Sequence, residues 1–185
     1  MKICIFCSAN GGIDPDFFDA TEELGRWAAE NGHTIVYGGV NMGLMEHVAK
    51  AAMETPKDSG HPRQVRTIGV VPRIVEQRGK ASQHNEVEIP CDNLNDRKQL
   101  MEEQSDAFIA LPGGIGTLDE IFTVAASATI GYHSKPILLY NMKGFWNPLI
   151  LLLDDLQRQG LMRNPWKNYI HVANSLEEIK QILKL

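Results

Sequence analysis

Short apolar runs, each followed by residues with helical spacing, recur along the whole 185-residue chain. Most of these runs are apolar throughout and do not alternate with polar residues, which is typical of strands buried on both faces of a parallel sheet. Strands are predicted at residues 3–7, 34–37, 67–71, 87–89, 107–111, 136–140 and 169–172. Helices are predicted at residues 17–29, 44–53, 94–104, 118–129 and 148–159, with a last helix after a Ser175-x-x-Glu178 capping box. The chain is therefore expected to be an α/β protein, a doubly wound parallel sheet with helices on both faces.

Two segments between these elements are predicted to be loops. Residues 55–66 are polar and contain two prolines, which indicates a surface loop. This segment is too short to divide the chain, so residues 1–185 are expected to form a single domain. Residues 75–85 carry charged and polar side chains with little periodicity, and we expect a mobile loop there.

Glycine turns follow three of the predicted strands, at Gly11-Gly12, Gly38-Gly39 and Gly113-Gly114-Gly116. Because parallel strands end at one edge of a sheet, we expect the three turns to meet where such folds bind ligands. The third turn belongs to L-P-G-G-I-G-T-L-D-E-I-F, residues 111–122, which is ordered as strand, glycine turn and helix start. Unpaired N–H groups at such a helix start suit a phosphate, and Glu120 lies one turn further in.

Two common nucleotide motifs are absent from the sequence. The turn after the first strand reads C-S-A-N-G-G-I, which does not match the dinucleotide fingerprint G-x-G-x-x-G. The Walker A pattern G-x-x-x-x-G-K-[ST] is also missing. A mononucleotide or a sugar phosphate is therefore the favoured ligand.

Both candidate groups near the third turn also have a purely structural interpretation. Thr117-x-x-Glu120 is itself a capping box, in which Glu120 would only hydrogen-bond back to the helix start. Arg97 and Lys98, which begin the preceding helix after Asp96, could be part of a solvated helix surface. The triple glycine, more than a simple turn needs, favours a binding site.

Charge and composition exclude several classes of function. The net charge of −5 argues against a nucleic-acid or acidic-membrane partner. The run Ile3–Cys7 is too short for a signal-peptide core, so a cytoplasmic protein is expected. Cys4 and Cys7 form C-x-x-C within a strand, where their side chains point to opposite faces, and buried inert thiols are expected. No cluster has metal-ligand spacing and no lysine stands out as a pyridoxal phosphate site, so neither a metal nor a cofactor is expected.

Three motifs together resemble the Lonely Guy (LOG) family of cytokinin riboside 5′-monophosphate phosphoribohydrolases. The motifs are R-K-x-x-M at residues 97–101, P-G-G-x-G-T-x-x-E at residues 112–120 and Y-G-G-x-x-x-G-L-M at residues 37–45. The resemblance implies a Rossmann-like homodimer that cleaves the N-glycosidic bond of a nucleoside 5′-monophosphate, with Arg97 and Glu120 as the catalytic pair. It also implies substrate-binding positions at Ser8, Gly39, Gly43, Met45, Lys98, Gly113, Gly114, Ile115, Gly116 and Thr117.

The chain departs from the usual family pattern at positions near the expected base or ribose. Ala9-Asn10 replaces the last two residues of C-G-S-S, and Glu46 replaces the second glycine of G-L-M-G. Base preference therefore stays open between cytokinin riboside monophosphates and AMP or other purine monophosphates. A non-catalytic nucleotide-binding or carrier module of the same fold is the alternative function.

Overall fold

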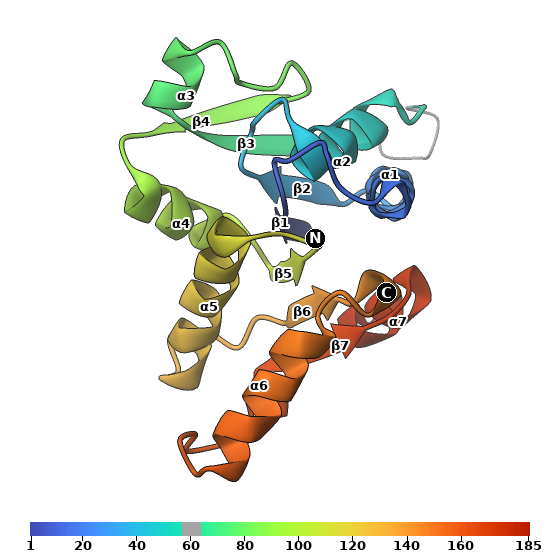
Figure 1. Cartoon of the computed structure of the whole chain (residues 1–185). Coiled ribbons are helices and arrows are strands. Elements are labelled where there is room, and N and C mark those ends of the chain that lie inside the picture. Colours follow the sequence, from blue (N-terminus) through green and yellow to red (C-terminus); the bar gives the residue numbers. More distant parts are fainter. Residues whose placement is uncertain (57–63) are drawn as a thin grey trace.

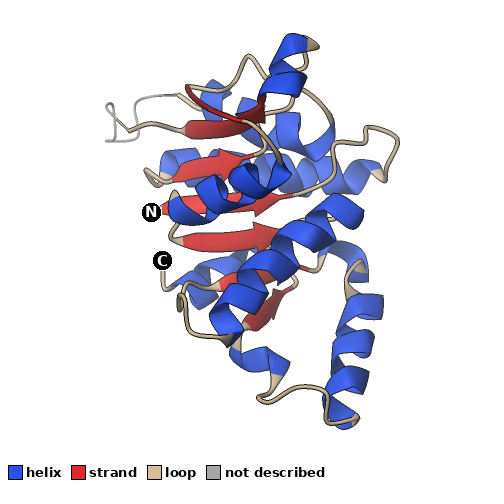
Figure 2. Cartoon of the chain, turned by 90° about the vertical axis from the view of Figure 1, so that its left-hand side faces the viewer, coloured by secondary structure: helices blue, strands red, loops and turns tan. Residues whose placement is uncertain are grey.

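The computed structural model describes residues 1–56 and 64–185. Within them, parallel strands form a sheet in the order β4-β3-β2-β1-β5-β6-β7. The strands are β1 (Lys2–Phe6), β2 (Thr34–Tyr37), β3 (Thr67–Pro72), β4 (Val87–Cys91), β5 (Ala107–Ala110), β6 (Ile137–Tyr140) and β7 (Ile170–Ala173). Their arrows all point the same way in Figure 2, and both chain termini lie at the edge where the strands begin. The predicted doubly wound parallel sheet is confirmed.

Helices cover both faces of this sheet (Figure 1). On one side lie α1 (Pro15–Glu30), α2 (Gly43–Glu54) and α7 (Leu176–Leu183), and on the other α4 (Leu94–Glu103), α5 (Ile115–Thr129) and α6 (Asn147–Arg158). Short helical turns are α3 (Arg73–Gln77), η1 (Met142–Gly144) and η2 (Trp166–Asn168). The strand order reverses between β1 and β5, which makes the carboxyl ends of these two strands the expected ligand site.

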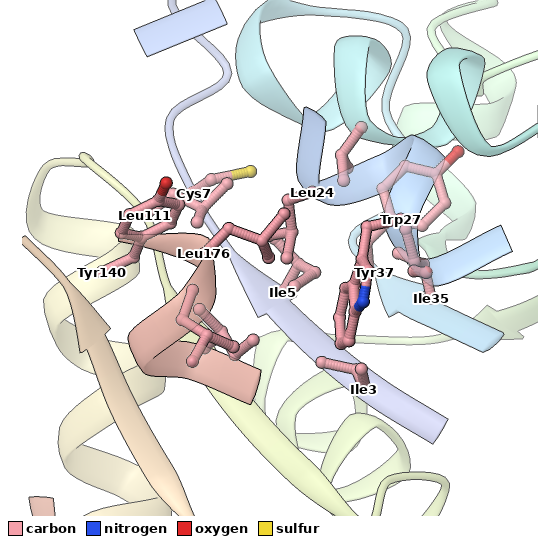
Figure 3. Packing of buried hydrophobic residues seen from close by; sticks show 14 of the residues in the cluster. Ile3, Ile5, Cys7, Leu24, Trp27, Ile35, Tyr37, Leu111, Tyr140 and Leu176 are labelled. Atoms are coloured by element: carbon pink, nitrogen blue, oxygen red, sulfur yellow. The ribbon is translucent and has the colours of Figure 1, made fainter. Parts of the chain in front are cut away.

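The core consists of two apolar clusters, one on each face of the sheet. The cluster under α1, α2 and α7 contains Ile3, Ile5 and Cys7 from β1 and the loop after it, and Figure 3 shows these side chains beside Leu24 and Leu176. Alternate residues of β1, such as Cys4, belong to the other cluster. Cys4 and Cys7 thus point to opposite faces, and both are buried free thiols as predicted.

Local signals explain several helix starts. Asp14 caps α1 by accepting a hydrogen bond from the Asp16 amide, and Pro15 occupies the first helical position. Ser175 caps α7 in the same way, accepting from the Glu178 amide at 3.2 Å. Glu178 reaches back to the amide of Asn174 and not to that of Ser175, so the predicted capping box is confirmed only in part.

Two predictions about local structure are corrected by the structure, and a third falls mostly outside the described residues. The helix predicted from residue 118 begins at Ile115, because the glycine turn itself forms the helix N-terminus. The mobile loop predicted at residues 75–85 includes the end of α3, and Lys80, Ser82 and Asn85 in the rest of it are hydrogen-bonded to the turn after β2. Most of the loop predicted at residues 55–66 lies outside the described residues.

Candidate active site

The turns after β1, β2 and β5 meet at the carboxyl edge of the sheet. The Ser8 amide donates to the Pro112 carbonyl at 3.1 Å, which joins the first turn to the third. The Leu44 amide donates to the Ser8 carbonyl at 2.9 Å, which joins the start of α2 to the first turn. Gly43 packs directly against the backbone of Ser8 and Ala9. The segments that follow the three strands therefore meet at one edge of the sheet, but the first of them does so through Ser8 and Ala9 and not through Gly11-Gly12.

The N-terminus of α5 projects from this junction without a side-chain cap. Gly114 is the N-cap residue, and the exposed Ile115 and Gly116 begin the first turn. Thr117 is the third helical residue, buried with its side chain against Gly113. The capping-box interpretation of Thr117-x-x-Glu120 is therefore wrong, because Thr117 is inside the helix. The first N–H groups of such a helix are available to an external acceptor.

Arg97 reaches the same edge from α4, whose start is capped by the side chain of Asn93. Its Nε donates to the Val70 carbonyl of β3 at 3.1 Å, and its Nη1 lies 3.5 Å from Oε1 of Glu120. Its Nη2 is buried and has no hydrogen-bond partner among the described residues. A buried donor without an acceptor costs free energy, so such atoms in native proteins are commonly completed by a ligand or water.

Space for the Arg97 guanidinium depends on Gly38. A Cβ atom added at Gly38 would overlap Nη2 of Arg97 and would lie 3.1 Å from the sulfur of Met45. Any larger residue at position 38 would therefore displace the arginine. Met45, a predicted binding residue, is nearly buried here at 8% exposure and lies beside the arginine without a polar contact of its own.

Glu120 is a buried carboxyl group with an unusual proton affinity. Its residue is 6% exposed, and burial raises its pKa to about 7, an effect that the Arg97 charge opposes and the Asp119 charge reinforces. The contact with Arg97 is long for a charge-assisted hydrogen bond, which explains why burial prevails over the ion pair. At neutral pH both the protonated and the ionised form of Glu120 are therefore populated, which suits a general acid or base.

Lys98 and Asp119 form a second ion pair next to the first. The Lys98 Nζ lies 2.8 Å from Oδ1 of Asp119, and the lysine side chain is 17% exposed. Lys98, the cation predicted near the phosphate turn, is therefore held against α5 by its ion pair with Asp119. The role of Asp119 was missed because an acidic residue in a first or second helical turn has several ordinary explanations.

The structure brings some predicted site residues together more closely than others. Arg97 and Glu120 are in contact, and Met45 of α2 lies on the same side of Gly38 as the guanidinium. Gly39 lies next to Gly38 in the turn after β2, but it packs against Val71, Gly69 and Asn85 and not against the arginine. Ser8 lies at the junction, but its hydroxyl already accepts a hydrogen bond from the Asn10 amide at 3.0 Å. Sequence reasoning missed the Val70 carbonyl, which carries no side-chain signal, and did not single out Gly38 from the Y-G-G motif.

No group of three or more His, Cys, Asp or Glu side chains within residues 1–56 and 64–185 is arranged to hold a metal ion. Among those same residues, no helix is both long enough and apolar enough to cross a membrane.

Sequence comparison connects this geometry to known proteins. The model of a family described as "Possible lysine decarboxylase" matches residues 45–183. A probable cytokinin riboside 5′-monophosphate phosphoribohydrolase of Oryza sativa subsp. japonica is 35% identical over 99% of this chain and 72% of its own length. A cytokinin riboside 5′-monophosphate phosphoribohydrolase of Arabidopsis thaliana is 33% identical over 99% of this chain and 82% of its own length.

Structure comparison supports the fold. The molybdenum cofactor carrier protein of Chlamydomonas reinhardtii superimposes with a TM-score of 0.71 at 21% identity, over 100% of this chain and 98% of its own. At that level of identity the likeness concerns the arrangement of strands and helices alone.

Proposed function

The chain belongs to the LOG family, and from this membership we propose that it hydrolyses the N-glycosidic bond of a purine ribonucleoside 5′-monophosphate. The products are the free base and ribose 5-phosphate. The observation that carries the proposal is the buried contact between Arg97 and Glu120 beside an uncapped helix N-terminus. The names of the relatives support the same reaction class.

Glu120 is proposed to act on the attacking water. The reaction breaks the bond between C1′ and the base nitrogen, whose electrons leave with the base, and forms a bond from C1′ to the water oxygen. A carboxylate beside the ribose stabilises the positive charge that develops on the sugar and accepts a proton from the water. The departing base takes up one proton from solvent and Glu120 later returns its proton to solvent, so the net change is the addition of one water. A pKa of about 7 suits this task, because the group is a stronger base than an ordinary carboxylate yet remains substantially ionised at neutral pH.

Arg97 is proposed to orient the sugar and the carboxylate. Its Nη1 faces Glu120, while its Nη2 has no acceptor among residues 1–56 and 64–185. A ribose hydroxyl oxygen would provide that acceptor. Because the bond from Nε to the Val70 carbonyl fixes the guanidinium plane, the arginine is oriented before substrate arrives.

The 5′-phosphate is proposed to bind at the start of α5. The turn from Gly113 to Thr117 offers the first N–H groups of the helix, and the helix dipole favours an anion there. Ser8 adjoins this turn, and Lys98 adds positive charge close by. This binding is remote from the bond that breaks, so its contribution is to position the sugar.

Base preference can be tested directly with a substrate panel. We propose incubating the purified protein with AMP, GMP, CMP and isopentenyladenosine monophosphate, and separating free base from nucleotide by chromatography. Release from one or more purine nucleotides, with none from CMP, is the expected result. Failure to release base from every nucleotide would support a non-catalytic binding module instead.

The pH dependence of the reaction follows from the Glu120 pKa. Since the carboxylate is the active form, kcat/KM is expected to fall about tenfold per pH unit below an apparent pKa near 7, and to level off above it. The substrate phosphate titrates near pH 6, so its protonation would steepen the fall only below that pH. Measuring kcat/KM for AMP between pH 5 and pH 9 checks this. An activity independent of pH across 6 to 8 would rule out Glu120 as the titrating base.

The chain is also proposed to be a homodimer. An apolar groove of about 500 Å³ lies between α5 and the segment that follows α6, lined by residues that include Phe122, Ile130, Leu153, Leu161, Trp166 and Tyr169. Ile130 and Leu161 are 66% and 69% exposed, which is unusual for large apolar side chains. A second copy of the chain would cover this surface.

Sizing of the protein in solution tests the dimer. The wild-type chain is expected to elute as a dimer, and Ile130→Glu as a monomer, because a charge would be placed within the buried surface. Ile74→Glu makes the same change at an apolar residue that is 54% exposed on α3, outside the groove, and should remain dimeric. A monomeric wild-type protein, or a dimeric Ile130→Glu variant, would refute this interface.

A further inference from the structure

Residues 79–86, called here the 79–86 loop, connect α3 to β4 and run along the turn after β2. Val40 and Ala81 form an antiparallel bridge. The Asn41 amide donates to the Lys80 carbonyl at 3.0 Å. The Ser82 amide donates to the Gly39 carbonyl at 2.8 Å. The loop therefore holds the backbone of the turn that carries Gly38.

Asn85 inserts its amide group behind this turn. Its Oδ1 accepts a hydrogen bond from the Tyr37 hydroxyl at 2.6 Å, and its Nδ2 donates to the Gly39 carbonyl at 3.3 Å and to Glu88 at 3.1 Å. A Cβ atom added at Gly69 of β3 would overlap this amide, so the side chain occupies a slot that only glycine leaves open. Asn85 is thus hydrogen-bonded to Tyr37 and Gly39, the residues directly before and after Gly38 in the chain.

The turn that Asn85 supports is in direct contact with Arg97. Gly39 adopts a left-handed conformation with φ of 65°, and its neighbour Gly38 packs its Cα against the guanidinium. Arg97 has no acceptor for Nη2 in the described part of the chain, so packing on Gly38 helps to define where that atom lies. A shift of this turn would move the arginine relative to Glu120.

A second anchor ties the 79–86 loop to α2. The Glu46 carboxylate accepts from the Ser82 hydroxyl at 2.5 Å and lies 2.7 Å from Nδ1 of His84. These side chains are partly buried, with 23% and 27% of the Glu46 and His84 side chains exposed. Glu46 therefore joins α2 to two side chains of the 79–86 loop.

We propose that the 79–86 loop positions Arg97 for catalysis through the Gly38-Gly39 turn, with Asn85 as the positioning residue. This inference rests on the proposed function, because it assigns a role within the same reaction. Asn85 does not touch the reacting atoms in this arrangement. Its effect is transmitted by the hydrogen bond to the Gly39 carbonyl in the turn backbone, and the hydrogen bond from the Tyr37 hydroxyl holds the amide in place.

The test compares Asn85→Ala and Asn85→Asp with the wild-type protein. Both variants should lower kcat for AMP about 10- to 100-fold with little change in KM, because the phosphate turn of α5 is untouched. The aspartate keeps the volume and the acceptor for Tyr37 but cannot donate to the Gly39 carbonyl. If Asn85→Asp retained wild-type kcat, the proposed hydrogen-bond route would be overturned even if Asn85→Ala failed to fold.

Asn141→Ala is the matched control, since Asn141 is also an amide hub with three hydrogen bonds, to Asn147, Asn174 and the Trp146 amide. It lies after β6, away from Arg97. This variant should lower the melting temperature but leave kcat unchanged. An equal loss of kcat in Asn141→Ala would show that the Asn85 effect reflects general destabilisation.

A second readout does not depend on turnover. Arg97 lowers the pKa of Glu120, so displacing the guanidinium should raise that pKa further. Titration of the Glu120 carboxyl by carbon NMR in the free protein is expected to show an increase in Asn85→Ala, which adds no charge of its own, and none in Asn141→Ala. An unchanged Glu120 pKa in Asn85→Ala, or in Asn85→Asp, would overturn the loop assignment. Absence of base release by the wild-type protein would refute only the proposed reaction, since the titration would still report on the loop.

Discussion

Replacing Glu120 by glutamine is expected to reduce the rate of base release about 1,000-fold or more. The amide keeps the size of the side chain, but it can neither accept a proton from water nor stabilise the positive charge that develops on the ribose. General base catalysis and electrostatic stabilisation each contribute factors of this order. Steady-state release of base from AMP measures the loss.

The same substitution is expected to stabilise the fold at alkaline pH. The pKa of Glu120 is about 7 in the folded protein and about 4.5 when unperturbed. The folded state therefore binds the proton more tightly, and the free energy of unfolding falls as pH rises from about 4.5 to about 7. Because glutamine has no charge to bury, Glu120→Gln should gain up to about 3 kcal/mol over the wild type at pH 8 and almost nothing at pH 4.

Denaturant unfolding of both proteins at the two pH values checks this gain. Glu103→Gln provides the control, because Glu103 is an exposed carboxylate near the end of α4. That variant should keep both wild-type activity and wild-type stability. A Glu120→Gln protein that unfolds at pH 8 would show that the carboxylate supports the fold, and wild-type turnover would show that it is not the catalytic base.

Gly38→Ala is expected to cause the second large effect, a loss of about 100-fold in kcat. The new methyl group would overlap Nη2 of Arg97, so the guanidinium must leave its position between Gly38 and Glu120. Displacements of about 1 Å in a catalytic group commonly cost this much. Initial rates with AMP, together with a crystal structure of the variant, would relate the loss to the arginine.

Gly11→Ala is the matched control for this substitution. An alanine Cβ at Gly11 would have no neighbouring atom within 4 Å, and this glycine has no left-handed φ. Its activity should equal that of the wild type. If Gly38→Ala were equally active, either the Arg97 position would not matter for the reaction or the turn would relax without moving the arginine, and the structure of the variant would decide between the two.

Much of the fold was predictable from local patterns. The continuous apolar runs at β1, β2 and β5 indicated buried parallel strands, and Asp14-Pro15 marked the start of α1. The start of α5 was placed three residues late, because Gly113 and Gly114 were read only as a turn although Gly114 is the N-cap of the helix. Glycine at an N-cap leaves no side-chain signal.

Less of the candidate site could be predicted from the sequence. Physical reasoning left open whether Glu120 was a helix cap and whether Arg97 was a surface residue, and only the family resemblance paired them. Their contact joins two helices, and the two residues are 23 positions apart in the chain. The raised pKa of Glu120 depends on burial by several elements at once, which no local pattern encodes.

The contacts of Asn85 illustrate the same limit. Its partners Tyr37 and Gly39 are more than 45 residues away, and the segment around it has no helical or strand periodicity. A segment without periodicity reads as a mobile loop, although long-range hydrogen bonds hold it in place here. Only the folded chain reveals that connection.

The most direct test of the proposed reaction is the product balance with AMP. Wild-type protein should release adenine and ribose 5-phosphate in a 1:1 ratio, measured by chromatography and a coupled assay for the sugar phosphate, whereas Glu120→Gln should release neither at a detectable rate. Binding of both AMP and isopentenyladenosine monophosphate without release of base from either, or equal release by Glu120→Gln, would contradict the assignment of Arg97 and Glu120 as a hydrolytic pair.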